Sequence, residues 1–253
     1  MKKTFLYLPV LAFILCSFTI LVEPPIDFYQ AQLRFPRVRE ALKTKGKLVD
    51  EMLISKGIST SNFEIFFRAF KNEQKLEIWA KNKNETSYKL LKIYDFCATT
   101  GVLGPKRRSG DRQMPEGFYT IDAFNPTSNY YLSFRVSYPN ASDKKFADPL
   151  NPGDNIFIHG SCISIGCIPV GDENIKELYI LAARAKSGEQ DIPVHIFPAK
   201  LTDENYTNLK QEYASNATLL EFWSWLKPGY DAFERTNVVP NVSVDDTGKY
   251  IVK

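Results

Sequence analysis

The thirteen residues from Ile158 to Val170 carry half of the cysteines and histidines of the chain. The segment reads IHGSCISIGCIPV and contains His159, Cys162 and Cys167, whereas the whole chain of 253 residues has four cysteines and two histidines. A thiolate attacks carbonyl carbon far better than a thiol does, and a nearby imidazole can generate it. The grouping therefore predicts a nucleophile, Cys167, with His159 as its base.

Two other chemistries fit the same side chains. A zinc ion could be held by His159, Cys162 and Cys167, but the spacing lacks the second pair of ligands that is typical of structural zinc sites. A Cys162–Cys167 disulfide is sterically allowed across the four intervening residues. Cys97 is the third cysteine beyond the N-terminal segment, so at least one of the three thiols stays free unless chains pair.

A strand and a tight loop are expected to position the base and the nucleophile. The run NIFIHG, residues 155–160, predicts a buried strand that fixes the imidazole ring. Gly166 precedes Cys167 in a loop whose backbone N–H groups can face a developing oxyanion. Ile163 and Ile165 are expected to pack this loop and keep it dry.

The remaining pattern predicts a helical start, a strand-rich body and a helical tail. Apolar residues recur at helical spacing in residues 35–57, and aromatic-rich runs separated by polar turns predict antiparallel strands from residue 63 onward. Further helical patterns cover residues 172–188, with Asp172 as N-cap, 205–213 and 218–226. A hairpin is expected around Asp245, and His195 is expected to be a packed, hydrogen-bonded residue of an apolar strand.

Composition limits the classes of protein to which the chain can belong. The chain has 32 basic and 29 acidic residues, a balance that argues against nucleic-acid binding, and 44% hydrophobic residues support a sizeable core. We expect no metal and no cofactor.

The N-terminus predicts export. Lys2 and Lys3 precede a largely apolar run, residues 5–22, which ends before two prolines. This is the pattern of a secretory signal. Since the run approaches the length of a membrane span and lacks an A-x-A cleavage site, it is either a cleaved signal peptide or a retained anchor in the inner membrane. The bulky residues before Cys16 do not suit lipid attachment. In each case the remainder lies in the periplasm or cell envelope.

Longer stretches resemble a known family. IHG followed by S-x-G-C is similar to the signature of the L,D-transpeptidase catalytic domain (YkuD-like), which ends in Ser/Thr-His-Gly-Cys. Residues 103–121, 125–141 and 158–181 resemble the YafK-like murein L,D-transpeptidase branch, and the likeness extends over about residues 35–200. Here the histidine and cysteine are closer together than in the common pattern, and Ile165 replaces its second histidine. The YafK-like branch shares both departures.

The resemblance implies roles for matching positions. Cys167 would attack the carbonyl of a peptidoglycan stem peptide and form a thioester after His159 has removed its proton. The Gly160 carbonyl would accept the other imidazole N–H, and the N–H groups of Gly166 and Cys167 would hold the oxyanion. Ser164 matches the Ser/Thr of the motif, and it would shape the loop or contact substrate.

Arg112 is the second candidate for substrate binding, after Ser164. It lies in the sequence GDRQMPEG, and its planar cation could clamp a carboxylate of the stem peptide. Pairing with Asp111 or with a backbone carbonyl is the structural alternative. The basic residues 106–108 are expected to form a solvated loop, with a role in steering the substrate as the alternative.

The fold implied is mainly β with peripheral helices (α+β), of the L,D-transpeptidase β-sandwich or barrel-like type. We expect a signal peptide or membrane anchor in residues 1–24, a helical segment in 25–60, the catalytic domain in 61–200 and a helical extension in 201–253.

Three functions follow from the resemblance. With an amine acceptor, the thioester gives cross-linking or attachment of a protein to the wall. With water, the same site is an amidase or L,D-carboxypeptidase that trims stems or releases wall-attached protein. The third is a wall-binding module without catalysis. The expected partners are stem peptides and a wall-attached protein, with no nucleic acid.

Overall fold

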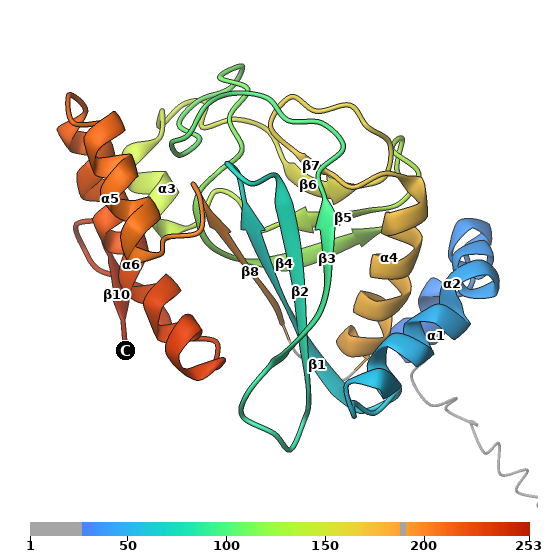
Figure 1. The fold of residues 1–253 in the computed structure, drawn as a ribbon. Helices are drawn as coiled ribbons and strands as arrows, with labels where there is room; N and C mark the ends of the chain where they lie inside the picture. Colours follow the sequence, from blue (N-terminus) through green and yellow to red (C-terminus); the bar gives the residue numbers. More distant parts are fainter. Residues whose placement is uncertain (1–26, 188–190) are drawn as a thin grey trace, which may run out of the picture.

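Eight strands form one curled sheet at the centre of the molecule (Figure 1). The computed structural model describes residues 27–187 and 191–253, and within these it has six helices and ten strands. The sheet strands are β1 (Phe63–Phe70), β2 (Lys75–Asn82), β3 (Lys89–Asp95), β4 (Gly117–Asn125), β5 (Ser133–Val136), β6 (Ile156–His159), β7 (Ile168–Pro169) and β8 (Ile192–Phe197). A separate hairpin consists of β9 (Val242–Val244) and β10 (Tyr250–Val252).

The sheet is mixed. Its strand order is β3-β2-β1-β8-β4-β5-β6-β7. Neighbouring strands are antiparallel except for two parallel pairs, β1 with β8 and β6 with β7. The expected class, mainly β with peripheral helices, is confirmed.

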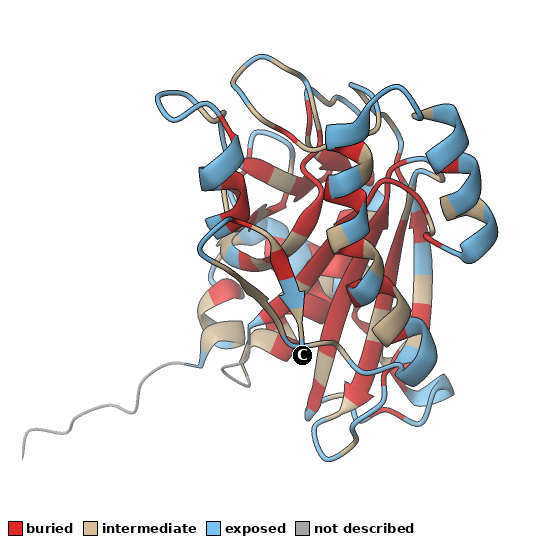
Figure 2. Cartoon of the chain, turned by 90° about the vertical axis from the view of Figure 1, so that its left-hand side faces the viewer, coloured by how far each residue is buried: buried red, intermediate tan, exposed pale blue. Residues whose placement is uncertain are grey.

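Helices cover both faces of the sheet, because its central strands are apolar on both sides. α1 (Phe28–Gln32), α2 (Pro36–Ser55) and α4 (Asp172–Lys186) lie on one side, and α3 (Ala141–Phe146), α5 (Asp203–Glu212) and α6 (Ala217–Thr236) lie on the other (Figure 1). In β1, Ile65 and Phe67 join the core shared with α2 and α4, whereas Phe70 packs with the C-terminal helices. Figure 2 shows the buried strands between helices whose outer faces are exposed.

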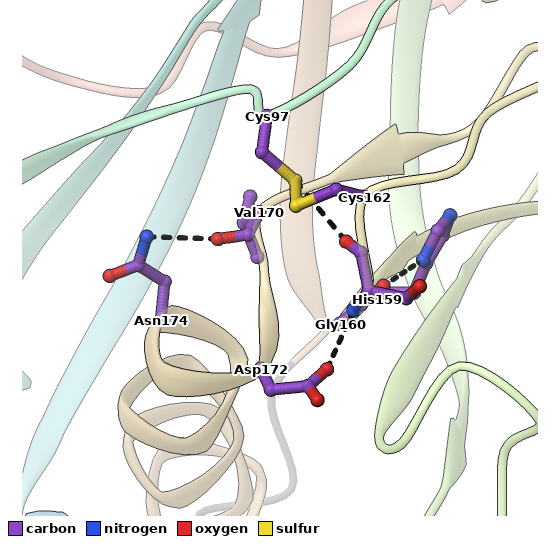
Figure 3. The surroundings of a disulfide bond; sticks show 8 residues. Cys97, His159, Gly160, Cys162, Val170, Asp172 and Asn174 are labelled. Atoms are coloured by element: carbon purple, nitrogen blue, oxygen red, sulfur yellow. Dashed lines mark hydrogen bonds between the residues drawn. A yellow bond between two sulfur atoms is a disulfide. The ribbon is translucent and has the colours of Figure 1, made fainter.

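The curl of the sheet brings its two edge strands together. Cys97 follows β3 at one edge, and its N–H donates a hydrogen bond of 3.0 Å to the carbonyl of Pro169 in β7, the other edge. A disulfide joins Cys97 to Cys162 in the β6–β7 loop, with the two Cα atoms 5.2 Å apart (Figure 3). One backbone hydrogen bond and one covalent bond thus link the sheet edges at this end.

The predicted helices and hairpin are confirmed, with one correction. α2, α4, α5 and α6 cover the four helical patterns, and β9 and β10 form the hairpin. Asp172 is not an N-cap, because α4 begins at this residue and Gly171 is its cap. The expected signal or anchor in residues 1–24 lies outside the described residues, and the division into four segments stays a prediction. None of the helices in residues 27–187 and 191–253 is long and apolar enough to span a membrane.

His195 is a core residue of β8. Its ring lies between those of Phe66 and Phe118, with centroids 4.6 and 4.7 Å away. Packing is therefore confirmed, but the expected hydrogen bond is not made at Nδ1, which has no partner. Burial, with the charge of Arg68, places the pKa of His195 well below its usual value.

Candidate active site

Strands β6 and β7 bring the predicted base and nucleophile onto neighbouring segments of the sheet. The strands pair in parallel with Ile158 opposite Ile168, and both isoleucines are buried in the core that includes α4. His159 is the last residue of β6, opposite Pro169, and Cys167 directly precedes β7. Within the part of the chain that the structure describes, no hydrogen bond joins the imidazole to the thiol.

The His159 ring is held by two contacts. Its Nδ1 makes a hydrogen bond with the carbonyl oxygen of Gly160, and the Tyr130 ring lies 4.5 Å away at an interplanar angle of 33°. Burial lowers the pKa of His159, although the Gly160 hydrogen bond acts in the opposite direction. With Nδ1 protonated toward a carbonyl, Nε2 of the neutral ring is free to accept a proton. The contact with Gly160 has the expected geometry, and its role in catalysis stays a prediction.

A cavity of about 480 Å³ opens over Cys167. Its walls consist of Lys106, Ser109, Gly110, Arg112, Tyr130, Asp154, Asn155, Ile156, Phe157, Ile165 and Cys167. Tyr130 is part of the wall and covers His159, which is only 1% exposed. The volume is within the range of cavities that bind small ligands.

The electrostatic surroundings favour a neutral thiol. Burial raises the pKa of Cys167, while a hydrogen bond with the backbone of Phe157 and the charge of Lys106 lower it. Because the pKa of His159 is lowered as well, the resting pair at neutral pH is a thiol and a neutral imidazole. The proton would then be transferred as the sulfur attacks.

Cys162 is removed from this chemistry by its bond to Cys97. The alternative Cys162–Cys167 disulfide is therefore wrong, and Cys167 is the free cysteine of the described residues. The zinc alternative is also wrong, because an oxidised sulfur is not a thiolate ligand. In the described ranges, no group of three or more His, Cys, Asp or Glu residues could hold a metal ion.

The start of α4 fixes the loop between base and nucleophile. The Ser161 N–H donates to Oδ1 of Asp172 at 2.7 Å (Figure 3), and Ser161 has a left-handed φ of 59°. A Cβ atom on Gly160 would lie 2.6 Å from Asp172 Oδ1 and 2.7 Å from the Tyr130 carbonyl oxygen. Only glycine fits there without displacement, so the residue after the base is fixed by packing.

Ser164 shapes the loop. Its hydroxyl donates to the carbonyl of Cys167 at 2.9 Å and accepts the N–H of Gly166 at 3.1 Å. Gly166 can therefore serve as an oxyanion donor only after this bond is released. The expectation that Ile163 and Ile165 keep the loop dry is wrong, because they are 65% and 71% exposed. Hydrogen bonds from Ser164, rather than apolar packing, hold this turn.

Arg112 lines the cavity, and its guanidinium has no ion pair or hydrogen bond in the described part of the chain. Asp111, its alternative partner, instead pairs with Lys106 at 2.6 Å. Lys106 also lines the cavity and is 5% exposed, so the expectation of a solvated loop is wrong for this residue. Its place at the cavity fits the alternative of a substrate-steering residue, whereas Tyr130 is a site residue that we did not predict from the sequence.

Comparison with known proteins identifies the family of the chain. The sequence profile of the L,D-transpeptidase catalytic domain family (YkuD) matches residues 65–196. The chain is 37% identical over 191 residues to "Putative L,D-transpeptidase YafK" of Escherichia coli strain K12, and to the same protein of strain O157:H7, over 74% of this chain and 73% of the relative.

Solved structures show weaker likeness. The helical cell shape determining protein Pgp2 of Campylobacter jejuni has a TM-score of 0.43 and 18% identity, covering 78% of this chain and 80% of that chain. Bd1075 of Bdellovibrio bacteriovorus has a TM-score of 0.39 and 18% identity, covering 72% and 77%. No conclusion rests on likeness at this level. From the sequence match to the profile and to YafK, the chain belongs to the L,D-transpeptidase catalytic domain family, whose members are peptidoglycan-related enzymes.

Proposed function

We propose that the chain is an exported cysteine acyltransferase that acts on peptidoglycan stem peptides through a thioester on Cys167, with His159 as the base. The observation that carries this proposal is a free thiol at a cavity, directly before β7, with an imidazole at the end of the paired strand β6. Family membership supports the substrate class.

The first half of the reaction follows from the two pKa shifts. Burial keeps both groups neutral, so Nε2 of His159 would take the thiol proton as the sulfur attacks the carbonyl carbon. The Gly160 carbonyl would stabilise the imidazolium through Nδ1. The oxyanion would be held by the N–H groups of Cys167 and, after release from Ser164, Gly166. Collapse of the intermediate would expel the amine, which takes the proton from the imidazolium and leaves a thioester.

The second half depends on the acceptor. An amine would attack the thioester in transpeptidation and would regenerate the thiol. Water is the acceptor in the second candidate function, an amidase or L,D-carboxypeptidase that trims stems or releases wall-attached protein. The exposure of Ile163 and Ile165 supports this second function, because solvent can reach the loop before Cys167 and supply the water. A free thiol beside a cavity argues against a wall-binding module without catalysis.

Arg112 is the side chain that we assign to substrate binding. Its unpaired guanidinium stands on the cavity wall, where it would hold a carboxylate of the stem peptide. Ser164 would contribute by holding the loop.

Export has one structural support besides the N-terminal pattern. The Cys97–Cys162 bond is exposed at both cysteines, and such bonds persist in oxidising compartments and are rare in the cytosol. We therefore infer that the protein lies in the periplasm or cell envelope. Residues 1–24 would direct its export and would then be either cleaved off or retained as a membrane anchor.

The test uses the full chain and purified muropeptides in water labelled with heavy oxygen. A product joined to a second stem indicates transfer, and incorporation of the label into a new carboxylate indicates hydrolysis. Cys167→Ser and His159→Gln should abolish either product, whereas Cys16→Ser, which changes the cysteine of the N-terminal segment, should not. If the wild-type product persists in Cys167→Ser, the proposed function is wrong.

A further inference from the structure

Lys106 is a buried cation beside the proposed nucleophile. Only 5% of it is exposed, and it shares the cavity wall with Cys167. Its Nζ donates to Oδ1 of Asp111 at 2.6 Å and to the carbonyl of Arg108 at 3.0 Å. Since a buried charge is costly, its position has to be fixed by partners such as these.

The surrounding chain leaves little freedom to the lysine. Oδ2 of Asp111 accepts the N–H groups of Arg107 and Arg108 at 2.8 and 3.0 Å, and Oδ1 accepts the N–H of Gln113 at 3.0 Å. On the other side, a Cβ atom on Gly153 would lie 2.4 Å from Cε of Lys106 and 2.9 Å from Nζ. The Asp111 turn and Gly153 therefore hold the ammonium in one place.

The same turn contacts the loop of the nucleophile. The carbonyl oxygen of Gln113 would lie 2.7 Å from a Cβ atom on Gly166, the residue before Cys167. The turn that binds Lys106 is thus packed directly against the chain that carries the thiol. In addition, the charge of Lys106 lowers the pKa of Cys167, against the larger effect of burial.

We propose that Lys106, fixed by Asp111, is a positioning residue whose ammonium stabilises negative charge on the sulfur of Cys167. The proposal rests on the proposed function in taking Cys167 as the nucleophile. Before attack, the charge favours transfer of the thiol proton to His159, and it stabilises the thiolate again when the thioester is resolved. Asp111 sets the strength of this effect, because its carboxylate offsets part of the lysine charge.

The cavity contains other ionisable groups. Arg112 adds a cation, Asp154 adds an anion from the segment before β6, and Tyr130 covers His159. Arg112 and Asp154 are exposed, so solvent screens their effect on the thiol more than it screens that of Lys106. Lys106 is therefore the cation whose removal should change the acidity of Cys167 most.

The experiment is the pH dependence of iodoacetamide alkylation at Cys167, measured on the full chain by peptide mass spectrometry, which separates Cys167 from Cys16. Lys106→Met should raise the pKa of the thiol by about one unit and slow alkylation about tenfold at a pH below the pKa. Asp111→Asn should lower this pKa, because the lysine loses its counter-charge. Lys106→Arg should stay near wild type.

Lys47→Met is the matched control. This lysine is 91% exposed on α2 and pairs with Glu51 across one turn, so its loss should leave the alkylation profile unchanged. An unchanged profile in Lys106→Met, or shifts in the same direction in Lys106→Met and Asp111→Asn, would overturn the proposal. If Lys106→Met does not fold, as judged by circular dichroism, Asp111→Asn decides alone, and a raised or unchanged pKa rejects the proposal.

This test is independent of turnover. If alkylation shifts as predicted but muropeptides are not converted, the proposed function fails and the charge effect stands. If muropeptides are converted but alkylation does not shift, the effect assigned to Lys106 fails and the proposed function stands.

Discussion

Replacing both Cys97 and Cys162 by serine removes the covalent bond between the two edges of the sheet. Both cysteines are exposed, so serine should fit at each position with little disturbance of the folded state. The change therefore acts mainly through the unfolded chain, which gains the freedom that the disulfide had removed.

The size of the effect follows from the length of the closed loop. The two cysteines are 65 residues apart, and the chain-entropy relation gives about 4 kcal/mol for a loop of this length at 25 °C. A typical domain is stable by about 5–15 kcal/mol in total. The loss should lower the melting temperature by about 8–16 °C for a chain of this size.

Guanidinium denaturation of the full chain checks this prediction. The double variant should lose about 4 kcal/mol of unfolding free energy, and dithiothreitol should bring the wild type to the same value. The control Cys167→Ser keeps the disulfide and should differ from wild type by less than about 1 kcal/mol. A loss below about 1 kcal/mol in the double variant, or a non-reducing peptide map that links Cys162 to Cys167, would refute the reasoning.

Three further substitutions test the packing of the loop after His159, a buried hydrogen bond and the titration of a core histidine. Gly160→Ala should cost about 1–3 kcal/mol in urea denaturation and abolish Cys167-dependent turnover, because its Cβ would meet Asp172 and a backbone carbonyl; unchanged stability contradicts the described loop. Trp223→Phe should cost about 1–3 kcal/mol, since Trp223 Nε1 donates to the fully buried Glu116 at 2.8 Å; a neutral effect in the same assay would show that this bond adds nothing. Because the pKa of His195 is lowered by burial, the unfolded chain binds more protons below pH ~6.5, and stability should fall on acidification by about 1.4 kcal/mol per pH unit from this residue. His195→Gln should remove that slope in denaturation series between pH ~6.5 and ~5, and identical slopes would reject the assignment.

The spacing of apolar residues along the sequence predicted most of the helices and strands, because this spacing directly reflects which face of each helix or strand is buried. Strands such as β1 read as aromatic-rich runs, and α2 and α4 showed helical spacing. The proposed pair of His159 and Cys167 was also readable, since both residues lie in one short segment that forms β6, a turn and β7.

The partner of Cys162 could not be predicted from the same patterns. Three cysteines allow three pairings, and the choice depends on how far an eight-stranded sheet curls before its edges meet. Sequence separation favours the nearby Cys167, whereas the fold places Cys97 at the loop. The pairing of Cys162 therefore depends on contacts between residues that are far apart in the sequence.

Residue type misled the interpretation at the rim of the cavity. Lys106 begins a basic run that resembles a solvated loop, but Asp111 five residues later folds back to pair with it. Ile163 and Ile165 are apolar and yet exposed, although the neighbouring Gly166 packs against the backbone of Gln113. An apolar side chain in a loop does not by itself predict burial.

Trapping the acyl-enzyme is the most direct test of the proposed nucleophile. The full chain is mixed with muropeptides, quenched in acid within the first turnover, and mapped by peptide mass spectrometry. We predict an added mass equal to the acyl part of the stem peptide on the peptide that contains Cys167, absent from Cys167→Ser and strongly reduced in His159→Gln. Turnover of muropeptides without any adduct on Cys167, or with an adduct on another residue, would contradict thioester catalysis at this site.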